Sequence, residues 1–167
     1  MKAILAMSKN RCIGKDGKLP WHHKEDFQWF KEFTMGKTLV VGRKTFDDLP
    51  ILKGRKCIGI TKGTEISRAM NSIIFKANKN GYDGALVPPH YVLDINAYYP
   101  DTVNSEYVIA GGKSIYELFM PHITEFYVTH IDKEYDGDTF MEPFEHLFSK
   151  NEVVKEFDFG RVIRYEK

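Results

Sequence analysis

The 167-residue sequence has only two cysteines, Cys12 and Cys57, and they lack the spacing of paired metal ligands. Two thiols cannot build the disulfide framework of a small secreted domain, so we expect both to be reduced. Long apolar runs are also missing. The apolar stretch within residues 1–10 is shorter than a signal peptide, and no stretch approaches a membrane span. We therefore expect a cytoplasmic protein with no membrane partner.

Neither sign of charge dominates, because 24 Lys and Arg stand against 23 Asp and Glu, a formal net charge of +1. A general nucleic-acid binder usually carries a basic excess or a basic run, so we expect no nucleic-acid partner. His22 and His23 are adjacent, which is the wrong spacing for two ligands on one helix face, and we expect no metal site. The length and the 43% of hydrophobic residues suit a single domain over residues 1–167.

Apolar runs alternate with helical patterns along most of the chain, which favours an α/β fold. The runs that predict buried strands are residues 3–7, 39–42, 57–61, 107–110 and 126–130. Helical patterns cover residues 24–35, a short stretch after 43–45, and residues 114–122. Near the C-terminus, residues 153–157 and 162–165 flank Asp158-Phe159-Gly160 and predict an antiparallel hairpin. The predicted sheet is therefore mixed and mostly parallel, with flanking helices.

Residues 63–106 are ambiguous. Ile66, Met70, Ile73 and Ala77 have helical spacing after Thr64, a residue type that caps helices. Residues 72–75 within them could equally form a strand, and residues 81–89 have the composition of a loop. We leave both alternatives open and assign this stretch no function.

An acidic residue at the start of the first helical pattern is the first candidate for chemistry. Asp26, Phe30 and Phe33 share one helix face, Phe27 lies beside them, and Leu19-Pro20-Trp21 precedes them in a loop. Glu25 and Asp26 could simply complement the helix dipole in its first turn. Alternatively, a carboxylate at the rim of an aromatic wall could bind two parallel N–H donors of a ligand.

Two strand-to-helix junctions are candidates for phosphate binding. Gly42-Arg43-Lys44-Thr45 offers backbone N–H groups and cations at a helix start, and Gly111-Gly112 lets a pyrophosphate approach the backbone before another helix. The alternatives are a solvated basic surface and a tight turn, and neither junction is the G-x-G-x-x-G fingerprint. Thr61-Lys62 also follows a strand. No acidic residue stands where it would hold a free ribose 2′-hydroxyl, which favours NADP over NAD.

Seven segments, taken together and in order, resemble the dihydrofolate reductase family over almost the whole chain. They are Ile13-Gly14, Leu19-Pro20-Trp21, Asp26-Phe27-x-x-Phe30-Lys31, Val41-Gly42-Arg43-Lys44-Thr45-Phe46, Leu52-x-Gly54-Arg55, Gly111-Gly112-x-x-Ile115-Tyr116 and Thr129-His130-Ile131. Each is a modest signal alone, and the set is specific. The resemblance implies a mixed sheet of about eight strands. It also implies a monomer that reduces dihydrofolate with NADPH and binds antifolate inhibitors.

The resemblance also implies a role for each site residue. Asp26, Trp21 and Thr129 would be catalytic, with Asp26 binding the pterin N3 and 2-amino group and Thr129 hydrogen-bonded to it. The substrate would contact Ile4, Leu5, Asp26, Phe27, Phe30, Leu49, Leu52, Arg55 and Thr129. Arg55 would pair with the α-carboxylate of the glutamate tail, which suits its planar fork. NADPH would contact Ala6, Ile13, Gly14, Leu19, Arg43, Lys44, Thr45, Thr61, Lys62, Gly111, Gly112, Lys113, Ser114, Ile115 and Tyr116.

By the same resemblance, residues 14–21 form a mobile active-site loop that Gly137-Asp138 steadies, and the Gly111–Gly112 peptide bond is cis. The chain also departs from the family: Phe27 stands where many members have Leu or Glu, Phe46 where many have Trp, and residues 49–51 are shortened. Two other functions remain open at this point. A pyrimidine reductase of riboflavin synthesis would lack the Asp26 arrangement, and a non-catalytic nucleotide-binding protein would have no use for it.

Overall fold

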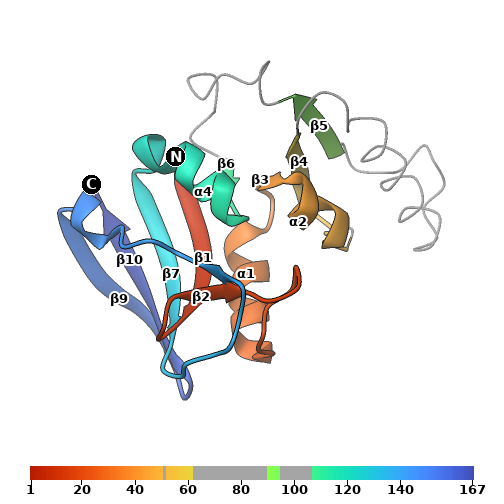
Figure 1. The fold of residues 1–167 in the computed structure, drawn as a ribbon. Coiled ribbons are helices and arrows are strands. Elements are labelled where there is room, and N and C mark those ends of the chain that lie inside the picture. Colours follow the sequence, from red (N-terminus) through yellow and green to blue (C-terminus); the bar gives the residue numbers. More distant parts are fainter. Residues whose placement is uncertain (51, 62–89, 95–106) are drawn as a thin grey trace.

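The computed structural model describes residues 1–50, 52–61, 90–94 and 107–167, without the side chains of residues 61 and 90–94. Within these residues, one large sheet contains β1 (Lys2–Ser8), β3 (Thr38–Gly42), β4 (Lys56–Thr61), β5 (His90–Asp94), β6 (Tyr107–Ile109), β7 (Glu125–Ile131), β9 (Lys150–Phe157) and β10 (Gly160–Glu166). Their order across the sheet is β5-β4-β3-β6-β1-β7-β10-β9 (Figure 1). The eight strands match the expected number.

The sheet is mixed and mostly parallel, as the sequence predicts. Every neighbouring pair from β5 to β7 is parallel, and β10 runs antiparallel to both β7 and β9. The C-terminal hairpin is thus confirmed. Parallel neighbours direct the carboxyl ends of their strands to one edge of the sheet, and this edge is where β3 and β6 lead into helices.

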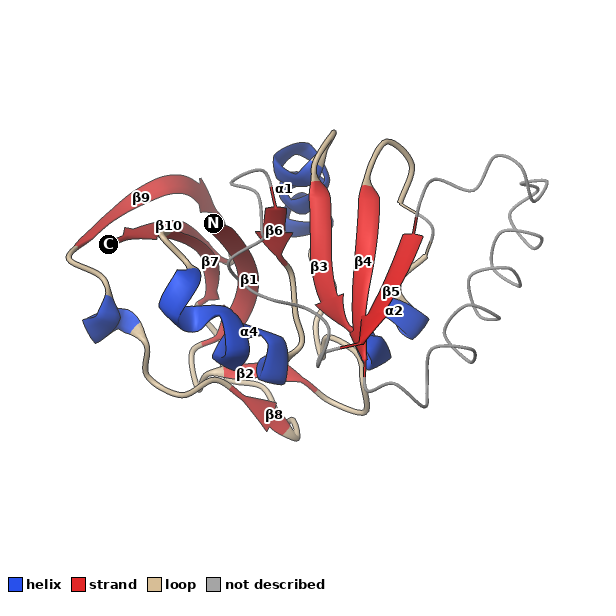
Figure 2. Cartoon of the chain, turned by 90° about the horizontal axis from the view of Figure 1, so that it is seen from above, coloured by secondary structure: helices blue, strands red, loops and turns tan. Residues whose placement is uncertain are grey.

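Helices cover both faces of the sheet, which explains the near-continuous apolar runs of the central strands. On one face, α1 (Lys24–Thr34) and α2 (Arg43–Asp48) pack on a core with Ile4 of β1; we call it the α1-side core. On the other, α4 (Lys113–Phe119) packs on a core with Leu5 of β1, the α4-side core. Figure 2 shows α1 and α4 on opposite sides of the strands.

Three features were not anticipated from the sequence. A separate two-stranded sheet joins β2 (Cys12–Gly14) to β8 (Thr139–Phe140), and a 3-10 helix, η4, covers Glu145–Leu147. The helix expected over residues 114–122 is divided into α4 and the 3-10 helix η3 (Met120–His122). Pro121 explains this division, because its nitrogen cannot donate the hydrogen bond that continues an α-helix.

The alternatives for residues 63–89, helix or strand followed by a loop, lie outside the described residues, as does the Lys62 side chain. Strand β5 falls in the stretch that sequence patterns left open. No helix among the described residues has the length and apolar character needed to cross a bilayer.

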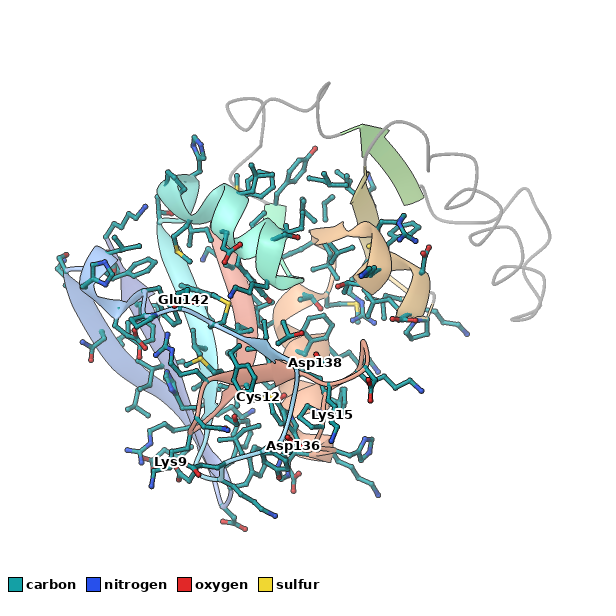
Figure 3. All side chains as sticks on the ribbon, viewed as in Figure 1. Lys9, Cys12, Lys15, Asp136, Asp138 and Glu142 are labelled. Atoms are coloured by element: carbon teal, nitrogen blue, oxygen red, sulfur yellow. The ribbon has the colours of Figure 1, made fainter. Side chains whose placement is uncertain are left out.

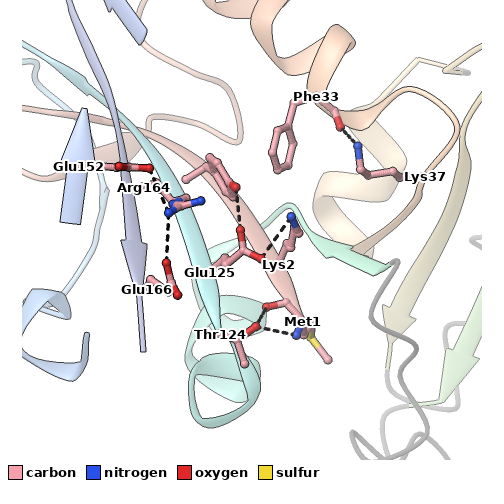
Figure 4. A network of polar contacts seen from close by, with 10 residues as sticks. Met1, Lys2, Phe33, Lys37, Thr124, Glu125, Glu152, Arg164 and Glu166 are labelled. Carbon is pink, nitrogen blue, oxygen red and sulfur yellow. Dashed lines mark hydrogen bonds and ion pairs between the residues drawn. The ribbon is translucent and has the colours of Figure 1, made fainter. Parts of the chain in front are cut away.

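Polar side chains connect neighbouring strands in the half of the sheet formed by β1, β7, β10 and β9 (Figure 4). Lys2 of β1 pairs with Glu125 of β7 at 3.2 Å, and Glu125 also accepts a hydrogen bond from Tyr127 at 2.7 Å. Arg164 of β10 pairs with Glu152 of β9 at 3.0 Å. Exposed pairs of this kind contribute little stability individually, so their main effect is on the pairing of neighbouring strands.

The tip of the C-terminal hairpin provides the first prediction. A Cβ at Gly160 would collide with the carbonyl oxygen of His130 on the neighbouring strand β7. We expect Gly160→Ala to lower the free energy of unfolding by about 3 kcal/mol, because backbone rather than a flexible side chain must move. Urea denaturation measures this loss.

Gly36→Ala is the matched control. Gly36 also has a positive φ, +74°, but nothing lies within 4 Å of an added Cβ. Its cost is therefore limited to the left-handed backbone conformation, about 1 kcal/mol. Equal losses in the two variants would contradict the steric explanation.

Candidate active site

Asp26 lies in the first turn of α1 and is only 7% exposed. Its Oδ1 accepts a hydrogen bond of 2.7 Å from the hydroxyl of Thr129 on β7, a residue 103 positions away that is itself 1% exposed. Ala6 of β1 is the register partner of Thr129. The neighbouring acid Glu25 is exposed, although it occupies the same helical turn. A dipole partner does not need burial, so burial distinguishes Asp26 from Glu25 and favours a ligand-binding role.

Burial raises the pKa of the Asp26 carboxyl above its ordinary value, because the charged form is costly away from water. Two smaller effects oppose this rise in pKa: the hydrogen bond from Thr129, and then the positive charge of His23. No described residue other than Thr129 donates a hydrogen bond to the carboxyl group. Asp26 therefore keeps unused acceptor capacity.

Apolar side chains cluster on the side of the sheet that α1 and Asp26 occupy. The α1-side core brings together Ile4, Phe30, Leu49 and Leu52, four of the predicted substrate contacts. Phe27, a fifth, leaves 42% of its surface exposed beside them. An exposed aromatic ring next to a buried carboxyl is available for a flat apolar ligand.

Leu5 is the predicted substrate contact whose side chain the structure directs elsewhere. Consecutive residues of a strand face opposite sides, so Leu5 packs in the α4-side core while Ile4 packs in the α1-side core. Leu5 can therefore reach the Asp26 side of the sheet only through its backbone. The resemblance pointed to the position and did not account for the direction of the side chain.

Trp21, at the end of the loop that precedes α1, is buried with 6% of its surface exposed. Its indole Nε1 is enclosed and has no hydrogen-bond partner among the described residues. The ring lies 5.2 Å from that of Tyr135, centroid to centroid. A buried indole N–H without a partner is an incomplete donor, which a ligand or a water can complete.

Arg55 follows α2 in the chain and is also buried, with 8% exposed. Its guanidinium donates to Thr34 Oγ1 at 3.2 Å and to the Lys53 carbonyl at 3.4 Å, and no described carboxylate pairs with it. Burial lowers the pKa of this guanidinium from its ordinary value. A buried cation without a counter-ion favours an anionic ligand, because a carboxylate would satisfy the planar fork.

The two predicted phosphate junctions lie side by side, because β3 and β6 are neighbours in the sheet. The Gly42 amide donates to the Gly111 carbonyl at 2.8 Å, and the Gly111–Gly112 bond is cis, as expected. A Cβ on Gly112 would lie 3.5 Å from the hydroxyl oxygen of Thr45. The absence of side chains at these glycines keeps the starts of α2 and α4 open to a ligand.

The remaining predicted cofactor contacts around these junctions have varied surroundings. Arg43 pairs with Asp47 at 2.8 Å, and Lys113 pairs with Glu142 at 3.3 Å. Lys44 and Ser114 are exposed, Ile115 packs in the α4-side core, and the Tyr116 hydroxyl donates to the Ile4 carbonyl at 2.6 Å. Thr61 ends β4, and its side chain is outside the described residues, like that of Lys62.

The loop of residues 14–21 is held by the segment that contains Gly137 and Asp138 (Figure 3). The Asp16 amide donates to the Asp138 carboxylate at 2.7 Å, and the Asp138 amide donates to the Gly14 carbonyl at 3.1 Å. Lys15 and Asp136 form an ion pair of 2.5 Å. Ile13 lies within β2, which pairs with β8 beside this contact, and Leu19 is 39% exposed farther along the loop. These contacts fix one position of the loop.

Sequence patterns missed two residues that support this loop. Tyr135 contacts Trp21, and its backbone is held by Asn10, whose side-chain amide donates to the Tyr135 carbonyl at 2.9 Å and accepts from its amide at 3.1 Å. The Ser8 hydroxyl in turn donates to Asn10 at 2.6 Å. Asn10 and Tyr135 are 125 positions apart, so no local signal could have connected them.

The fold and these contacts define an α/β enzyme that places a buried carboxyl group and two glycine-lined helix starts on one sheet. A sequence model described as Dihydrofolate reductase matches residues 1–158, and the chain belongs to the dihydrofolate reductase family. It is therefore an oxidoreductase. The family match favours a dihydrofolate reductase over the alternative of a pyrimidine reductase.

Individual relatives agree with this family over most of their length. The dihydrofolate reductase type 8 of Escherichia coli is 33% identical to this chain over 100% of it and 95% of the relative. The dihydrofolate reductase of Enterococcus faecium is 34% identical over 93% of this chain and 84% of the relative. A solved structure of the dihydrofolate reductase from Enterococcus faecalis, complexed with NADP(H) and RAB-propyl, matches with a TM-score of 0.70 and 26% identity, covering 99% of this chain and 94% of that one.

The contact that holds the loop predicts the effect of a small substitution. A Cβ at Gly137 would overlap Cys12 Sγ and the Gly14 carbonyl oxygen. We expect Gly137→Ala to displace residues 14–21 and to reduce turnover about tenfold, while thermal stability changes little, because the strain falls on a loop contact. Turnover with saturating substrates and the melting temperature measure the two effects.

Cys12→Ala provides the matched test of the mechanism, because it removes one of the two overlapping atoms and leaves the Gly14 carbonyl. The double variant should recover part of the lost turnover. If Cys12→Ala gives no recovery and the Gly137→Ala protein is globally destabilised, the contact does not act by holding residues 14–21 in position.

Proposed function

We propose that this protein reduces 7,8-dihydrofolate to 5,6,7,8-tetrahydrofolate with NADPH, in support of one-carbon metabolism and thymidylate synthesis. The observation that carries the proposal is the buried Asp26 carboxyl, whose one protein donor is Thr129 within the described residues, beside the apolar wall of Ile4 and Phe30. The Enterococcus faecalis relative, which is complexed with NADP(H), supports the choice of cofactor.

Asp26 binds the pterin ring in this proposal. Its carboxylate accepts from N3 and the 2-amino group, two parallel donors that match two carboxylate oxygens. Ile4, Phe27 and Phe30 flank the ring, Leu49 and Leu52 flank the benzoyl group, and Leu5 contributes its backbone. The two donors would contribute strongly to the free energy of binding, because a buried carboxylate without hydrogen-bond partners is costly.

Arg55 binds the α-carboxylate of the glutamate tail. Its buried guanidinium has no described carboxylate partner, and Thr34 fixes its orientation through the hydrogen bond at 3.2 Å. A bidentate pair would supply the missing counter-charge. The two ends of the substrate are thus matched by groups of opposite charge, Asp26 and Arg55.

The residues at the two helix starts fit a dinucleotide phosphate. Gly42, Gly111 and Gly112 leave the backbone bare, and Thr45 offers a hydroxyl within reach of Gly112. The pyrophosphate would be held by Lys44, Thr45, Gly112, Lys113 and Ser114, with Ala6, Ile13, Gly14 and Leu19 on the nicotinamide side. Arg43 would face the 2′-phosphate with Lys62, which favours NADPH over NADH.

When bound, NADPH supplies the hydride, which passes from nicotinamide C4 to pterin C6. The chain controls the proton that N5 must also receive. Asp26 lies on the opposite edge of the ring and favours the protonated state electrostatically, while a water held by the Trp21 indole N–H delivers the proton. Residues 14–21 then exclude bulk water from the reaction.

The proposal also covers the number of domains, the oligomeric state and the location of the protein. Residues 1–167 would act as a single cytoplasmic domain and as a monomer, with dihydrofolate and antifolates as small-molecule partners. The match of the Escherichia coli relative over 95% of its length supports one domain of this size.

A direct assay tests the activity and the role of Asp26 together. The protein mixed with NADPH and dihydrofolate should lose NADPH absorbance, and methotrexate should inhibit the loss. Asp26→Asn should lower kcat/KM at pH 7 by at least about 100-fold while keeping the fold, because a neutral amide cannot favour the protonated substrate. Glu25→Gln is the control, since Glu25 is exposed in the same turn. Undiminished activity of Asp26→Asn would overturn the assignment.

The role of Arg55 predicts a change in substrate affinity. Arg55→Gln should raise the KM for dihydrofolate about 100-fold with a smaller change in kcat, because the lost ion pair is far from the reacting atoms. Lys56→Gln, which removes the exposed neighbouring cation, should leave KM unchanged. A dihydropterin without the glutamate tail should be reduced equally well by both variants. A loss of NADPH affinity in Arg55→Gln would show that the site is oriented the other way.

A further inference from the structure

His23 occupies the position immediately before α1, where its backbone is extended and its carbonyl accepts the Phe27 amide at 3.2 Å. Its side chain makes no capping hydrogen bond. Asp26 is the third residue of the helix, and side chains at the cap and at this third position adjoin each other across the first turn. The geometry of α1 therefore places His23 and Asp26 at neighbouring positions of the first helical turn, with no direct ion pair or capping hydrogen bond from the imidazole among the described residues.

A stack of aromatic rings fixes the imidazole. The His23 ring lies flat on Phe159 in the hairpin turn between β9 and β10, with centroids 3.8 Å apart and planes inclined by 5°. Phe159 stacks in turn on Phe157, with centroids at 4.8 Å and an angle of 8°. The Phe159 carbonyl accepts the Asp132 amide at 2.9 Å, which ties the turn to the end of β7. The ring of His23 is therefore held by a segment that is distant in the sequence.

Packing alone does not account for the choice of histidine. The Nε2 atom of His23 is enclosed and has no hydrogen-bond partner among the described residues. A purely apolar ring would stack on Phe159 without this cost. The charged residues nearest to His23 and Phe159 in the sequence are Lys24, Glu25 and Asp26 of α1, and Asp158 and Arg161 beside the hairpin turn. Of these only Asp26 is buried, and Arg161 is paired with Asp132 at 3.8 Å.

We infer that His23 is a positioning residue for the proposed reaction: its ring, held by the stack on Phe159, sets the protonation equilibrium of Asp26. The inference rests on the proposed function, in which Asp26 binds the pterin. A protonated imidazole favours the ionised carboxyl, because opposite charges stabilise each other strongly in partly buried surroundings. The lowering of the Asp26 pKa by His23 has this sign.

The sign of the expected effect follows directly. Burial raises the pKa of Asp26, while Thr129 and the charge on His23 lower it. Removing the imidazole therefore removes one of the two effects that favour the carboxylate, and the pKa of Asp26 must rise.

The test is a titration of Asp26 by NMR in protein labelled with ¹³C at the aspartate carboxyls, with the signal assigned by its loss in Asp26→Asn. His23→Phe keeps an aromatic ring on Phe159 and removes the charge, so the pKa of Asp26 should rise above that of the unmodified protein. His22→Phe is the matched control, since His22 is exposed and contacts Phe27 at 5.0 Å. Thr129→Val is the positive control and should also raise the pKa.

Two further measurements separate titration from packing. Phe159→Leu keeps His23 but removes the stack, so the pKa should rise by less than in His23→Phe. The pH at which kcat is half-maximal should move upward with the pKa of Asp26 in each variant. If His23→Phe does not fold, His23→Gln is titrated in its place.

An unchanged Asp26 titration in His23→Phe, or an equal shift in His22→Phe, would overturn the inference. The titration does not need turnover. A protein that fails to reduce dihydrofolate but shows the shift would refute the proposed function alone. An active protein without the shift would refute the role of His23 alone.

Discussion

The hydrogen bond between Asp26 and Thr129 is the constraint on which the site depends. A carboxyl group with 7% of its surface exposed must be compensated, and among the described residues Thr129 is the one donor that reaches it. The bond fixes the start of α1 over β7, and the register of β7 with β1 places Ala6 next to Thr129. The position of the apolar wall relative to the carboxyl follows from this link, because Phe30 lies on α1 and Ile4 lies on β1, the strand that pairs with β7.

Two other buried polar groups of the site also lack full sets of partners among the described residues. Arg55 is buried without a described carboxylate, and the Trp21 indole N–H is enclosed without an acceptor. A fold selected only for stability would pair such groups or replace them with apolar side chains. In the proposed function, a substrate with a polar ring and an anionic tail would satisfy the unused capacity of Asp26 and Arg55.

Local patterns predicted the elements whose signal is periodic and long. The apolar run of β1 predicted a buried strand, and the spacing of Phe27, Phe30 and Phe33 predicted α1. The pairing of β2 with β8 was out of reach, because strands of three and two residues carry no period. Asp26 and Thr129 came together through the family resemblance, since no spacing spans 103 positions. The resemblance predicted Leu5 as a substrate contact, but β1 directs its side chain to the face opposite α1, because consecutive strand residues alternate in direction.

Two segments remote from Asp26 nevertheless bear on its chemistry. The Asp138 segment holds residues 14–21 beside the site, and the C-terminal hairpin holds His23 through Phe159. In the proposed reaction both would act on the same quantity, the free energy of the charged carboxyl: loop closure would remove water and raise this free energy, whereas the imidazole charge would lower it. The proposed reaction needs these effects to be opposed, because the carboxyl must both bind the N–H donors of the pterin and favour proton uptake at N5. Because the Asp138 segment holds the loop and the C-terminal hairpin holds His23, a substitution in one segment can alter its own effect without altering that of the other.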